Sequence, residues 1–468
     1  MHRLKTRLPL TLCMCVLFTP SAYTQQFSVL YDFGSGGSQD PAQPSYSGII
    51  AQGRDGNLYS TTPYSLDGHI DGTVFKITPR GALTVLYSFS PGTSGIYPYS
   101  GLVLGTDHNF YGTTQMEGDE NGTVFKITPN GQFSVLYTFA GGSDGGRASA
   151  PPIQGNDGNF YGTTSDGYSQ SPYGTVYKLA PAGLLTPLYQ FDQRHGASPY
   201  APLVEGRDGS FYGVTTTGGN FNFGVAFKIT RRGKLTVLYN FDVAHGSQPF
   251  GPLVQGNDGN FYGTTFNGGA KGSGVIFQLK RNGRLKVIHD FQGSGGGFYS
   301  CTGLVQASDG NFYGTTHSGG PADAGTIFRI TPKGRYTVLH QFDGTDGKFP
   351  MVTLTQHTNG VFYGDTKEGG AISSCNGGCG TFYSLNMGLP PFVSLAPSSG
   401  KVGRKVELLG QGFTGTTAVS FNGVAASFNV VSDTYLTASV PDGATTGFVT
   451  VTTPGGKLKS NREFQVPQ

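Results

Sequence analysis

Two pairs of histidine and aspartate have the residue types and the spacing that metal binding or acid–base catalysis requires. The motif Phe-Asp-x-x-His-Gly-x-x-Pro occurs twice, at 191–199 and at 241–249. Its two copies supply Asp192, His195, Asp242 and His245. A carboxylate beside an imidazole can bind a metal ion or exchange a proton near neutral pH. Because duplication copies residues whether or not they act, the sequence favours solvated loop histidines, with a metal or acid–base site as the alternative.

Aromatic residues recur just before one short strand of a repeated unit. They are Tyr46, Tyr99, Tyr200 and Phe250, with looser equivalents at Tyr299 and Phe349. Aromatic rings gathered at the mouth of a channel can stack on sugars or on peptide side chains. Recurrence along the repeat is also what packing between neighbouring units produces. Packing is the favoured interpretation, and ligand binding is the alternative.

The cysteines beyond the N-terminal segment are Cys301, Cys375 and Cys379. Either Cys375 pairs with Cys379 within the loop CNGGC, or one of them pairs with Cys301. A single CxxxC without a nearby histidine is weak evidence for a metal site. The sequence favours a disulfide that staples the loop and leaves one thiol over.

Other reactive patterns are weak. An aspartate recurs in a tight Gly turn of most copies, but calcium needs several oxygens that converge on one point. One Asp beside a Gly is typical of a hairpin turn. No nucleophile elbow, HExxH motif or phosphate-cradling loop stands out. The sequence therefore predicts no catalytic residue, no metal and no cofactor.

The composition indicates the elements that must position these residues. The chain has 468 residues with 76 Gly, 13% charged and 13% aromatic residues, and no Trp. Gly is enriched without a collagen period, and the aromatic content excludes simple disorder. Low charge with abundant Gly and Tyr predicts an all-β, turn-rich protein.

Residues 1–24 read as a secretory signal peptide. Arg3, Lys5 and Arg7 form a basic region before the apolar stretch 8–18, and Ala22 and Thr24 suit cleavage near Gln25. The alternative is a retained membrane anchor. Removal of the segment brings the formal charge from +3 to about 0. No basic surface for nucleic acid and no further membrane span is expected.

A repeat of about 51 residues dominates the chain. The segment NFYGTT and its variants recur with tyrosines 50 to 52 residues apart, at Tyr59, Tyr111, Tyr161, Tyr212, Tyr262, Tyr313 and Tyr363. Each period holds four strand-like runs, with two tight Gly turns on one face and two long loops on the other. Four antiparallel strands repeated radially predict the blades of a β-propeller.

The ends of the repeat favour a closed ring over a solenoid. The seventh copy stops after its third strand at 380–385, and the missing strand stands at 27–33 as FSVLYDF. A strand from the N-terminus would complete the last blade and remove exposed sheet edges. The sequence therefore predicts a seven-bladed propeller over 25–387, closed by its N-terminal strand.

The repeat resembles that of the GloVer tandem-repeat proteins, on DGNFYGTT, GTVFKI and VLYxF in order. The resemblance covers nearly all of 27–387. It implies a bacterial exported repeat protein and brings no catalytic residues. The seventh copy departs most, with Asn359 in place of Asp and Asp365 in place of the first Thr.

A proline-rich linker at 388–392 ends the repeat. The segment 393–468 carries PSSG, VELLGQGF, VSFNG and VTVTT, and it resembles the IPT/TIG domain. The resemblance implies a small immunoglobulin-like β-sandwich that acts as a spacer or an adhesion module. Alternation in VSFNG and VTVTT independently predicts half-buried strands.

Together these observations predict an exported, monomeric binding or adhesion protein, secreted or on the cell surface, that recognises a glycan or a surface protein. The alternative is an extracellular propeller lyase or hydrolase that acts on polysaccharide at the channel mouth. An enzyme should concentrate unusual polar residues on a few copies, whereas these copies are regular. Binding is therefore favoured over catalysis.

Overall fold

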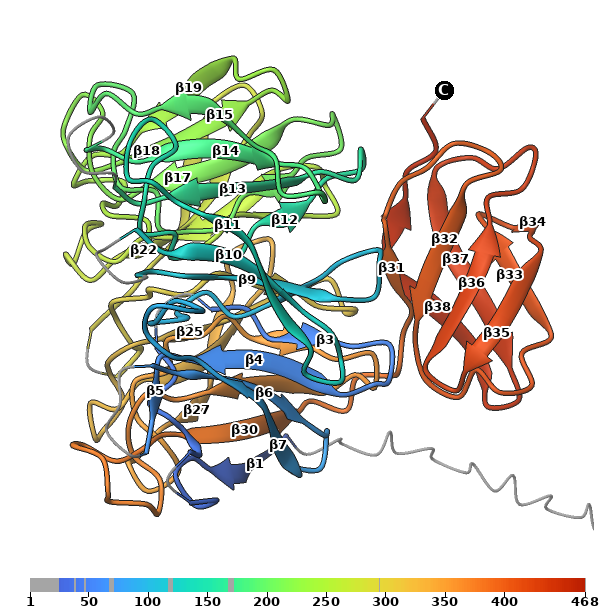
Figure 1. Cartoon of the computed structure of the whole chain (residues 1–468), viewed down its shortest axis with the longest axis horizontal. Coiled ribbons are helices and arrows are strands. Elements are labelled where there is room, and N and C mark those ends of the chain that lie inside the picture. The colour runs from blue at the N-terminus through green and yellow to red at the C-terminus, as the bar shows by residue number, and fades with distance from the viewer. Residues whose placement is uncertain are drawn as a thin grey trace, which may run out of the picture.

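The computed structural model describes residues 25–37, 39–45, 48–66, 71–116, 121–166, 172–293 and 295–467. These residues form strands and turns and include no helix, as expected for an all-β chain (Figure 1). The predicted signal peptide at 1–24 and the aromatic candidate Tyr46 lie outside the described residues.

Seven four-stranded antiparallel sheets fill the described chain up to Asn386. We call this part the repeat domain and number its sheets in chain order. Sheet 1 is β3 (Ala51–Gln52), β4 (Leu58–Thr62), β6 (Thr73–Ile77) and β7 (Leu83–Ser88). Sheet 2 is β8 (Val103–Leu104), β9 (Phe110–Thr114), β10 (Thr123–Ile127) and β11 (Phe133–Thr138). Sheet 3 is β12 (Ile153–Gln154), β13 (Phe160–Thr164), β14 (Thr175–Leu179) and β15 (Leu185–Gln190).

The next sheets repeat this order. Sheet 4 is β16 (Val204–Glu205), β17 (Phe211–Thr215), β18 (Val225–Ile229) and β19 (Leu235–Asn240). Sheet 5 is β20 (Val254–Gln255), β21 (Phe261–Thr264), β22 (Val275–Leu279) and β23 (Leu285–Asp290). Sheet 6 is β24 (Val305–Gln306), β25 (Phe312–Thr316), β26 (Thr326–Ile330) and β27 (Tyr336–Gln341). A separate two-stranded sheet joins β2 (Pro41–Ala42) to β5 (Tyr64–Ser65).

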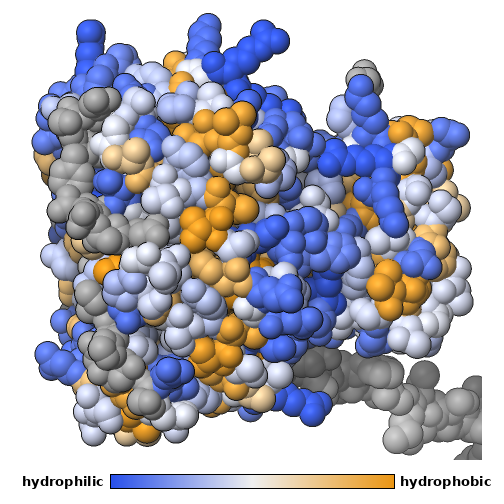
Figure 2. Space-filling model, in the orientation of Figure 1, coloured by the Kyte–Doolittle hydropathy of each residue, from blue (hydrophilic) through white to orange (hydrophobic). Residues whose placement is uncertain are grey.

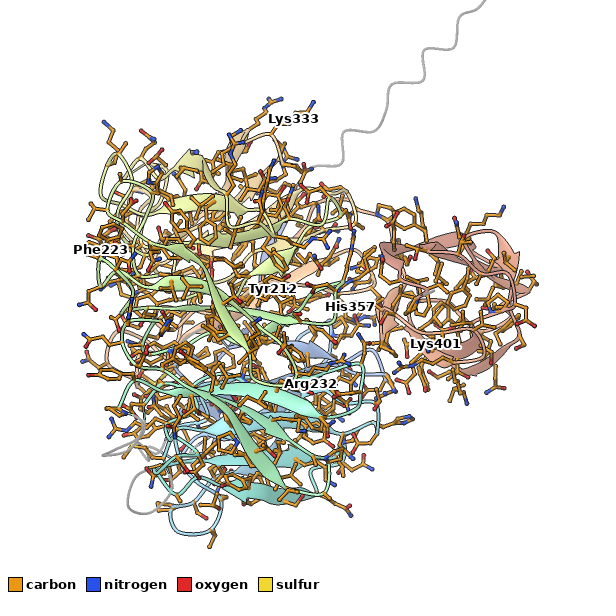
Figure 3. All side chains as sticks on the ribbon, turned by 90° about the horizontal axis from the view of Figure 1, so that it is seen from above. Tyr212, Phe223, Arg232, Lys333, His357 and Lys401 are labelled. Carbon is orange, nitrogen blue, oxygen red and sulfur yellow. A yellow bond between two sulfur atoms is a disulfide. The ribbon has the colours of Figure 1, made fainter. Side chains whose placement is uncertain are left out.

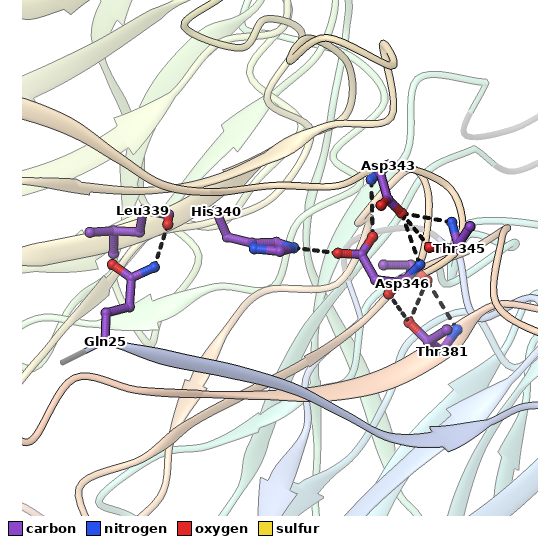
Figure 4. Close-up of polar contacts among 8 residues, drawn as sticks. Gln25, Leu339, His340, Asp343, Thr345, Asp346 and Thr381 are labelled. Carbon is purple, nitrogen blue, oxygen red and sulfur yellow. Dashed lines mark hydrogen bonds and ion pairs between the residues drawn. The ribbon is translucent and has the colours of Figure 1, made fainter.

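Sheet 7 takes its outer strand from the N-terminus. It consists of β28 (Thr355–Gln356), β29 (Phe362–Asp365), β30 (Thr381–Asn386) and β1 (Gln26–Asp32). In β1, Gln26 lies opposite Asn386 and Asp32 lies opposite Thr381. Figure 4 shows its start, where Gln25 donates to the carbonyl of Leu339 and His340 lies 2.7 Å from Asp346. The strand missing from the last copy is thus supplied by the segment that the sequence indicated.

The first and last sheets lie side by side. Ile49, just before sheet 1, forms parallel bridges both to Gly101 and to Thr353. The Thr355 hydroxyl donates to the carbonyl of Ile50 at 2.8 Å. Gly81 has a left-handed φ of 92°, and a Cβ there would lie 2.4 Å from the carbonyl oxygen of Leu30 in β1. This turn of sheet 1 therefore needs glycine for both its conformation and its contact with sheet 7.

The core of the repeat domain lies between neighbouring sheets. The NFYGTT strands are buried at almost every residue because they are covered on both faces. The tyrosine of one strand packs on the phenylalanine of the next, as Tyr59 does on Phe110 with ring centroids 4.0 Å apart. The Tyr59 hydroxyl also donates to Asp55 of its own turn at 2.7 Å. The turn aspartates thus serve hairpins, as the sequence predicted.

The C-terminal strands form two packed sheets, which we call the sandwich domain. One sheet is β31 (Ser394–Ala396), β32 (Lys405–Leu409), β36 (Tyr435–Ser439) and β35 (Phe428–Ser432). The other is β34 (Val424–Ala425), β33 (Ala418–Phe421), β37 (Gly447–Thr453) and β38 (Gly456–Phe464). Leu408, Phe413 and Phe421 are among the buried residues between them.

The sandwich domain lies against one face of the repeat domain (Figures 1 and 3). This face carries the tight turns, and we call it the turn face; the opposite face, with the long loops, is the loop face. Arg54 of the first turn forms an ion pair with Glu407, and their side chains are 10% and 15% exposed. The Thr434 hydroxyl donates to the carbonyl of Arg54 at 2.6 Å, and the Phe392 amide donates to the carbonyl of Thr358 at 3.0 Å.

Candidate functional site

A ring of polar side chains surrounds the inner strands at the turn face. In six of the seven sheets, the side chain of the last residue of the inner strand accepts a hydrogen bond from a backbone amide in the turn of the preceding sheet. Gln154 accepts from Thr106 at 2.8 Å, and Gln356 accepts from Ser308 at 2.9 Å. The same role is filled by Gln52, Glu205, Gln255 and Gln306. Sheet 2 is the exception, because Leu104 stands at this position and has no acceptor.

A cavity of about 1100 Å³ lies between this ring and the sandwich domain. The inner strands of sheets 3 to 7 line it on one side, and segments of the sandwich domain around 397–401 and 461–467 line it on the other. Ligand pockets in proteins usually measure roughly 300–1,000 Å³. This space is therefore large enough for a small oligomeric ligand. Figure 2 shows hydrophilic residues where the surface passes from one domain to the other.

Positive charge prevails in the cavity lining. Its cations are Arg207, Arg231, Lys401, Arg404 and Arg462, and its acids are Glu205, Asp208 and Glu463. Arg231 forms an ion pair with Glu205, and Asp208 lies 2.7 Å from Lys228. Burial opposes the charge of Arg231, but the hydrogen bond and charge of Glu205 outweigh it and raise the pKa of Arg231.

The loop face carries the aromatic candidates. Tyr200 lies 5.8 Å from Phe250 between ring centroids, and Phe250 lies 5.5 Å from Phe266. Phe266 stacks on Tyr299 at 4.7 Å, which in turn meets Phe298 at 4.7 Å. These five half-buried rings form one continuous group, which we call the aromatic arc. They pack against one another across sheets and also leave part of each ring at the surface.

The remaining predicted aromatics differ from Tyr200 and Phe250 in their contacts or in their position in the motif. Tyr99 stacks on Tyr97 with ring centroids 5.6 Å apart, in a group separate from the arc. Tyr299 and Phe349 are not at the position of Tyr200 but two residues earlier in the motif, where φ is left-handed, at 56° and 58°. The sequence alone did not reveal this two-residue difference, because an aromatic residue can occur at either position of the motif.

The two His–Asp pairs are local turns. In the first, His195 Nδ1 lies 2.7 Å from Asp192 Oδ2, and in the second, His245 Nδ1 lies 2.9 Å from Asp242 Oδ1. Each aspartate also accepts the backbone amide of its own histidine. Each histidine ring meets the tyrosine of its own sheet's outer strand, Tyr189 or Tyr239. Within the described ranges, no contact joins one pair to the other, and no cluster of three His, Cys, Asp or Glu suits a metal ion.

The cysteines divide into a disulfide and a buried thiol. Cys375 and Cys379 are bonded, which is one of the two alternatives that the sequence left open. Cys301 is buried, and burial raises the pKa of its thiol to about 12. A thiol in this environment is not an activated nucleophile.

Two further groups have no counterpart in the other copies. His317 on the loop face stacks on Phe349 at 4.3 Å, and Lys348 lies 4.3 Å above the same ring. Asp365 of sheet 7 is fully buried, and neither of its side-chain oxygens has a hydrogen-bond partner. Burial raises the pKa of Asp365 well above its usual value. The sequence shows that Asp365 replaces the threonine of the repeat, but it does not show that the buried carboxyl group lacks hydrogen-bond partners.

The sequence comparisons agree with this architecture. The Gloeobacter/Verrucomicrobia repeat matches residues 15–167, 116–303 and 231–416. The chain belongs to the Gloeobacter/Verrucomicrobia repeat family. The IPT/TIG domain matches residues 390–466, over the sandwich domain of this Gloeobacter/Verrucomicrobia repeat protein. Both resemblances seen in the sequence are confirmed. No curated protein matches the chain.

Several solved structures are similar to this Gloeobacter/Verrucomicrobia repeat protein. A Bacteroides thetaiotaomicron protein of unknown function has 14% identity and a TM-score of 0.44, over 78% of this chain and 76% of that one. A periplasmic gluconolactonase of Pseudomonas aeruginosa has 16% identity and a TM-score of 0.43, over 71% and 97%. A Xanthomonas campestris gluconolactonase has 10% identity and a TM-score of 0.41, over 75% and 98%. At TM-scores below 0.5, these likenesses assign no activity to the chain.

No helix among the described residues is long and apolar enough to span a membrane.

Proposed function

We propose that this protein is an exported binding protein, secreted or at the cell surface, whose loop face recognises a glycan. In this proposal the seven sheets are the blades of a closed propeller, and the N-terminal strand locks the ring. The sandwich domain covers the turn face and leaves the loop face to the ligand. The proposal rests on one observation: the continuous aromatic arc on the loop face.

The arc suits a sugar ligand for physical reasons. Its rings are fixed by contact with one another, so little conformational entropy is lost when a ligand stacks on them. Tyr and Phe faces bind the apolar faces of sugar rings, and the Tyr200 and Tyr299 hydroxyl groups add polar contacts at the edge. Long loops on a rigid scaffold are where binding residues are usually found.

A glycan array with residues 25–468 tests the proposal. We expect a specific polysaccharide to bind, and Tyr200→Ala and Phe250→Ala each to weaken binding at least 10-fold with folding retained. The matched control is Phe221→Ala, which removes an aromatic side chain that is 57% exposed in a loop outside the arc. An array without a hit, or variants that bind like the parent, would show that the arc serves only packing between sheets.

A further inference from the structure

The cavity between the two domains gathers cations from both of them. Arg207 follows the inner strand of sheet 4, and Arg462 stands in β38 of the sandwich domain. Lys401 and Arg404 precede β32 and face the same space. We propose that this cavity is a second binding site, for a small polyanion with two or more carboxylate, sulfate or phosphate groups held chiefly by Arg207, Arg404 and Arg462.

Two of the three acids in the lining are paired with cations other than Arg207, Lys401, Arg404 and Arg462, so these four cations outnumber the one acid that remains. Glu205 is engaged by Arg231 and by the Asn156 amide. Asp208 is engaged by Lys228 and by the Tyr212 hydroxyl. Glu463, the third acid, lies within 4 Å of no cation of the described chain. The excess positive charge is therefore a property of the cavity and not of one side chain.

The guanidinium groups have donors to spare. One Arg207 nitrogen donates to the Asn257 carbonyl at 3.3 Å, and one Arg404 nitrogen donates to the Asn156 carbonyl at 3.4 Å. The Arg462 guanidinium has no hydrogen-bond or ion-pair partner among the described residues. Since a guanidinium carries five N–H donors in a planar fork, most of these donors remain open to an oxyanion.

The two arginines from opposite domains also act on each other. Arg462 lies in the cavity wall and is exposed to the solvent of the cavity. Desolvation by the two domains that flank the cavity, and after it the charge of Arg207, lower the pKa of Arg462. Like charges held together in this way repel, and a bound anion between them removes that repulsion.

The placement of the cations determines the kind of ligand. The cations come from separate elements of both domains, around a cavity of about 1100 Å³ that is far larger than one small ion. A molecule with several anionic groups matches this arrangement of separate cations. Such a ligand would join the repeat domain to the sandwich domain, and binding should stabilise their docking. The site lies on the face opposite the aromatic arc, so it is independent of the proposed glycan site.

Isothermal titration of residues 25–468 at low ionic strength tests the inference. The probes are trigalacturonate, tripolyphosphate and citrate, with uncharged cellotriose as the control ligand. We expect at least one anionic probe to bind, with affinity that falls as salt rises, and cellotriose not to bind. Binding of trigalacturonate alone would identify a carboxylated sugar, and binding of tripolyphosphate alone a phosphorylated ligand.

Matched variants decide whether the cavity is the site. Arg207→Gln and Arg462→Gln should each lower affinity at least 10-fold, with thermal unfolding close to that of the parent. Arg194→Gln removes the same charge from an exposed position in the loop after β15, away from the cavity, and should leave affinity unchanged. The inference is overturned if no anionic probe binds, or if the three variants lower affinity alike.

Discussion

The Gln52 side chain joins the first sheet to the last through two hydrogen bonds with Thr358, which is 306 residues away. Its carbonyl oxygen accepts from the Thr358 amide at 2.9 Å, and its amide nitrogen donates to the Thr358 hydroxyl at 2.8 Å. The same hydroxyl donates to the Gly410 carbonyl and accepts from Gln411 of the sandwich domain. One threonine thus connects the ends of the repeat with the docking of the second domain.

We predict that Gln52→Leu destabilises this closure. Leucine fits the site, because sheet 2 carries Leu104 at the equivalent position. The loss of two partly buried hydrogen bonds should lower the free energy of unfolding by about 1–3 kcal/mol. Hydrogen exchange should increase at the Thr358 amide and along β1.

The matched control is Gln306→Leu, which breaks the same kind of bond between sheets 5 and 6. It should cost a similar amount of free energy in urea unfolding but leave exchange in β1 unchanged. Equal exchange in β1 for both variants would show that Gln52 has no special role in closure.

A second prediction concerns the Arg54–Glu407 ion pair. Glu407→Ala would leave the Arg54 guanidinium buried at the domain interface without its counter-charge, and breaking such a pair usually costs about 3–5 kcal/mol. We expect the two domains to separate, with a larger radius of gyration in solution scattering and faster proteolysis in 387–391.

The double variant Arg54→Met with Glu407→Leu shows whether the domains separate because a charge is left unpaired or because packing at the interface is lost. It removes both charges, so docking should be restored at least in part. A double variant that separates as far as Glu407→Ala would contradict this account. Both variants also lose the contact between Glu407 and His108, which lie 3.5 Å apart, so this contact does not account for a difference between them.

The repeat could be predicted from the sequence, but the cavity between the two domains could not. Periodic tyrosines and Gly turns predict strands and their order because each copy obeys the same local rules of pattern and turn chemistry. The seventh copy lacks its fourth strand, and from this we predicted that the N-terminal segment supplies the outer strand of the last sheet. The docking of the sandwich domain could not be predicted, since Arg54 and Glu407 belong to no shared motif and lie 353 residues apart.

The candidate residues show the same division. Asp192 and His195 were recognisable as a pair because both lie in one turn, and the structure keeps them there. The cations Arg207 and Arg462 come from different domains, and only their placement in space brings them to one cavity. The spacing of Arg207 and Arg462 in the sequence therefore gives no indication that they share a site.

A third prediction concerns pH. His317 is largely buried, and burial, with Lys367 next in importance, lowers its pKa to about 4; Asp323 opposes this effect and Lys348 adds to it. The unfolded chain therefore binds a proton between pH 6.5 and 4 that the folded chain does not bind. Stability should fall as pH drops through this window, by at most about 1.4 kcal/mol per pH unit.

Nuclear magnetic resonance can follow the His317 ring directly, and its midpoint should lie near 4. His317→Phe keeps the stacking on Phe349 and should remove this part of the pH dependence of unfolding. His195→Phe, in an exposed turn, is the control and should keep it. A His317 midpoint near 6.5 would refute the assignment.

The last prediction is that Asp365→Thr stabilises the protein. Threonine stands at this position in five other copies, where Thr163, for example, donates to the Ala201 carbonyl at 3.2 Å. Asp365 has no such partner, and burial of a polar group without one costs about 1–3 kcal/mol. The variant should recover free energy of this order in urea unfolding at pH 7.

The pH dependence of that gain identifies its cause. Because the pKa of Asp365 is raised in the fold, the folded chain keeps a proton that the unfolded chain loses above pH 4. The parent protein is therefore penalised progressively as pH rises above 4, and the advantage of Asp365→Thr should be larger at pH 7 than at pH 4. Asp365→Asn keeps the shape and removes the titration, so its advantage over the parent should also shrink at pH 4. An advantage of Asp365→Thr that is equal at both values would mean that Asp365 is ionised in the fold, held by a charge or a hydrogen bond that its surroundings do not show.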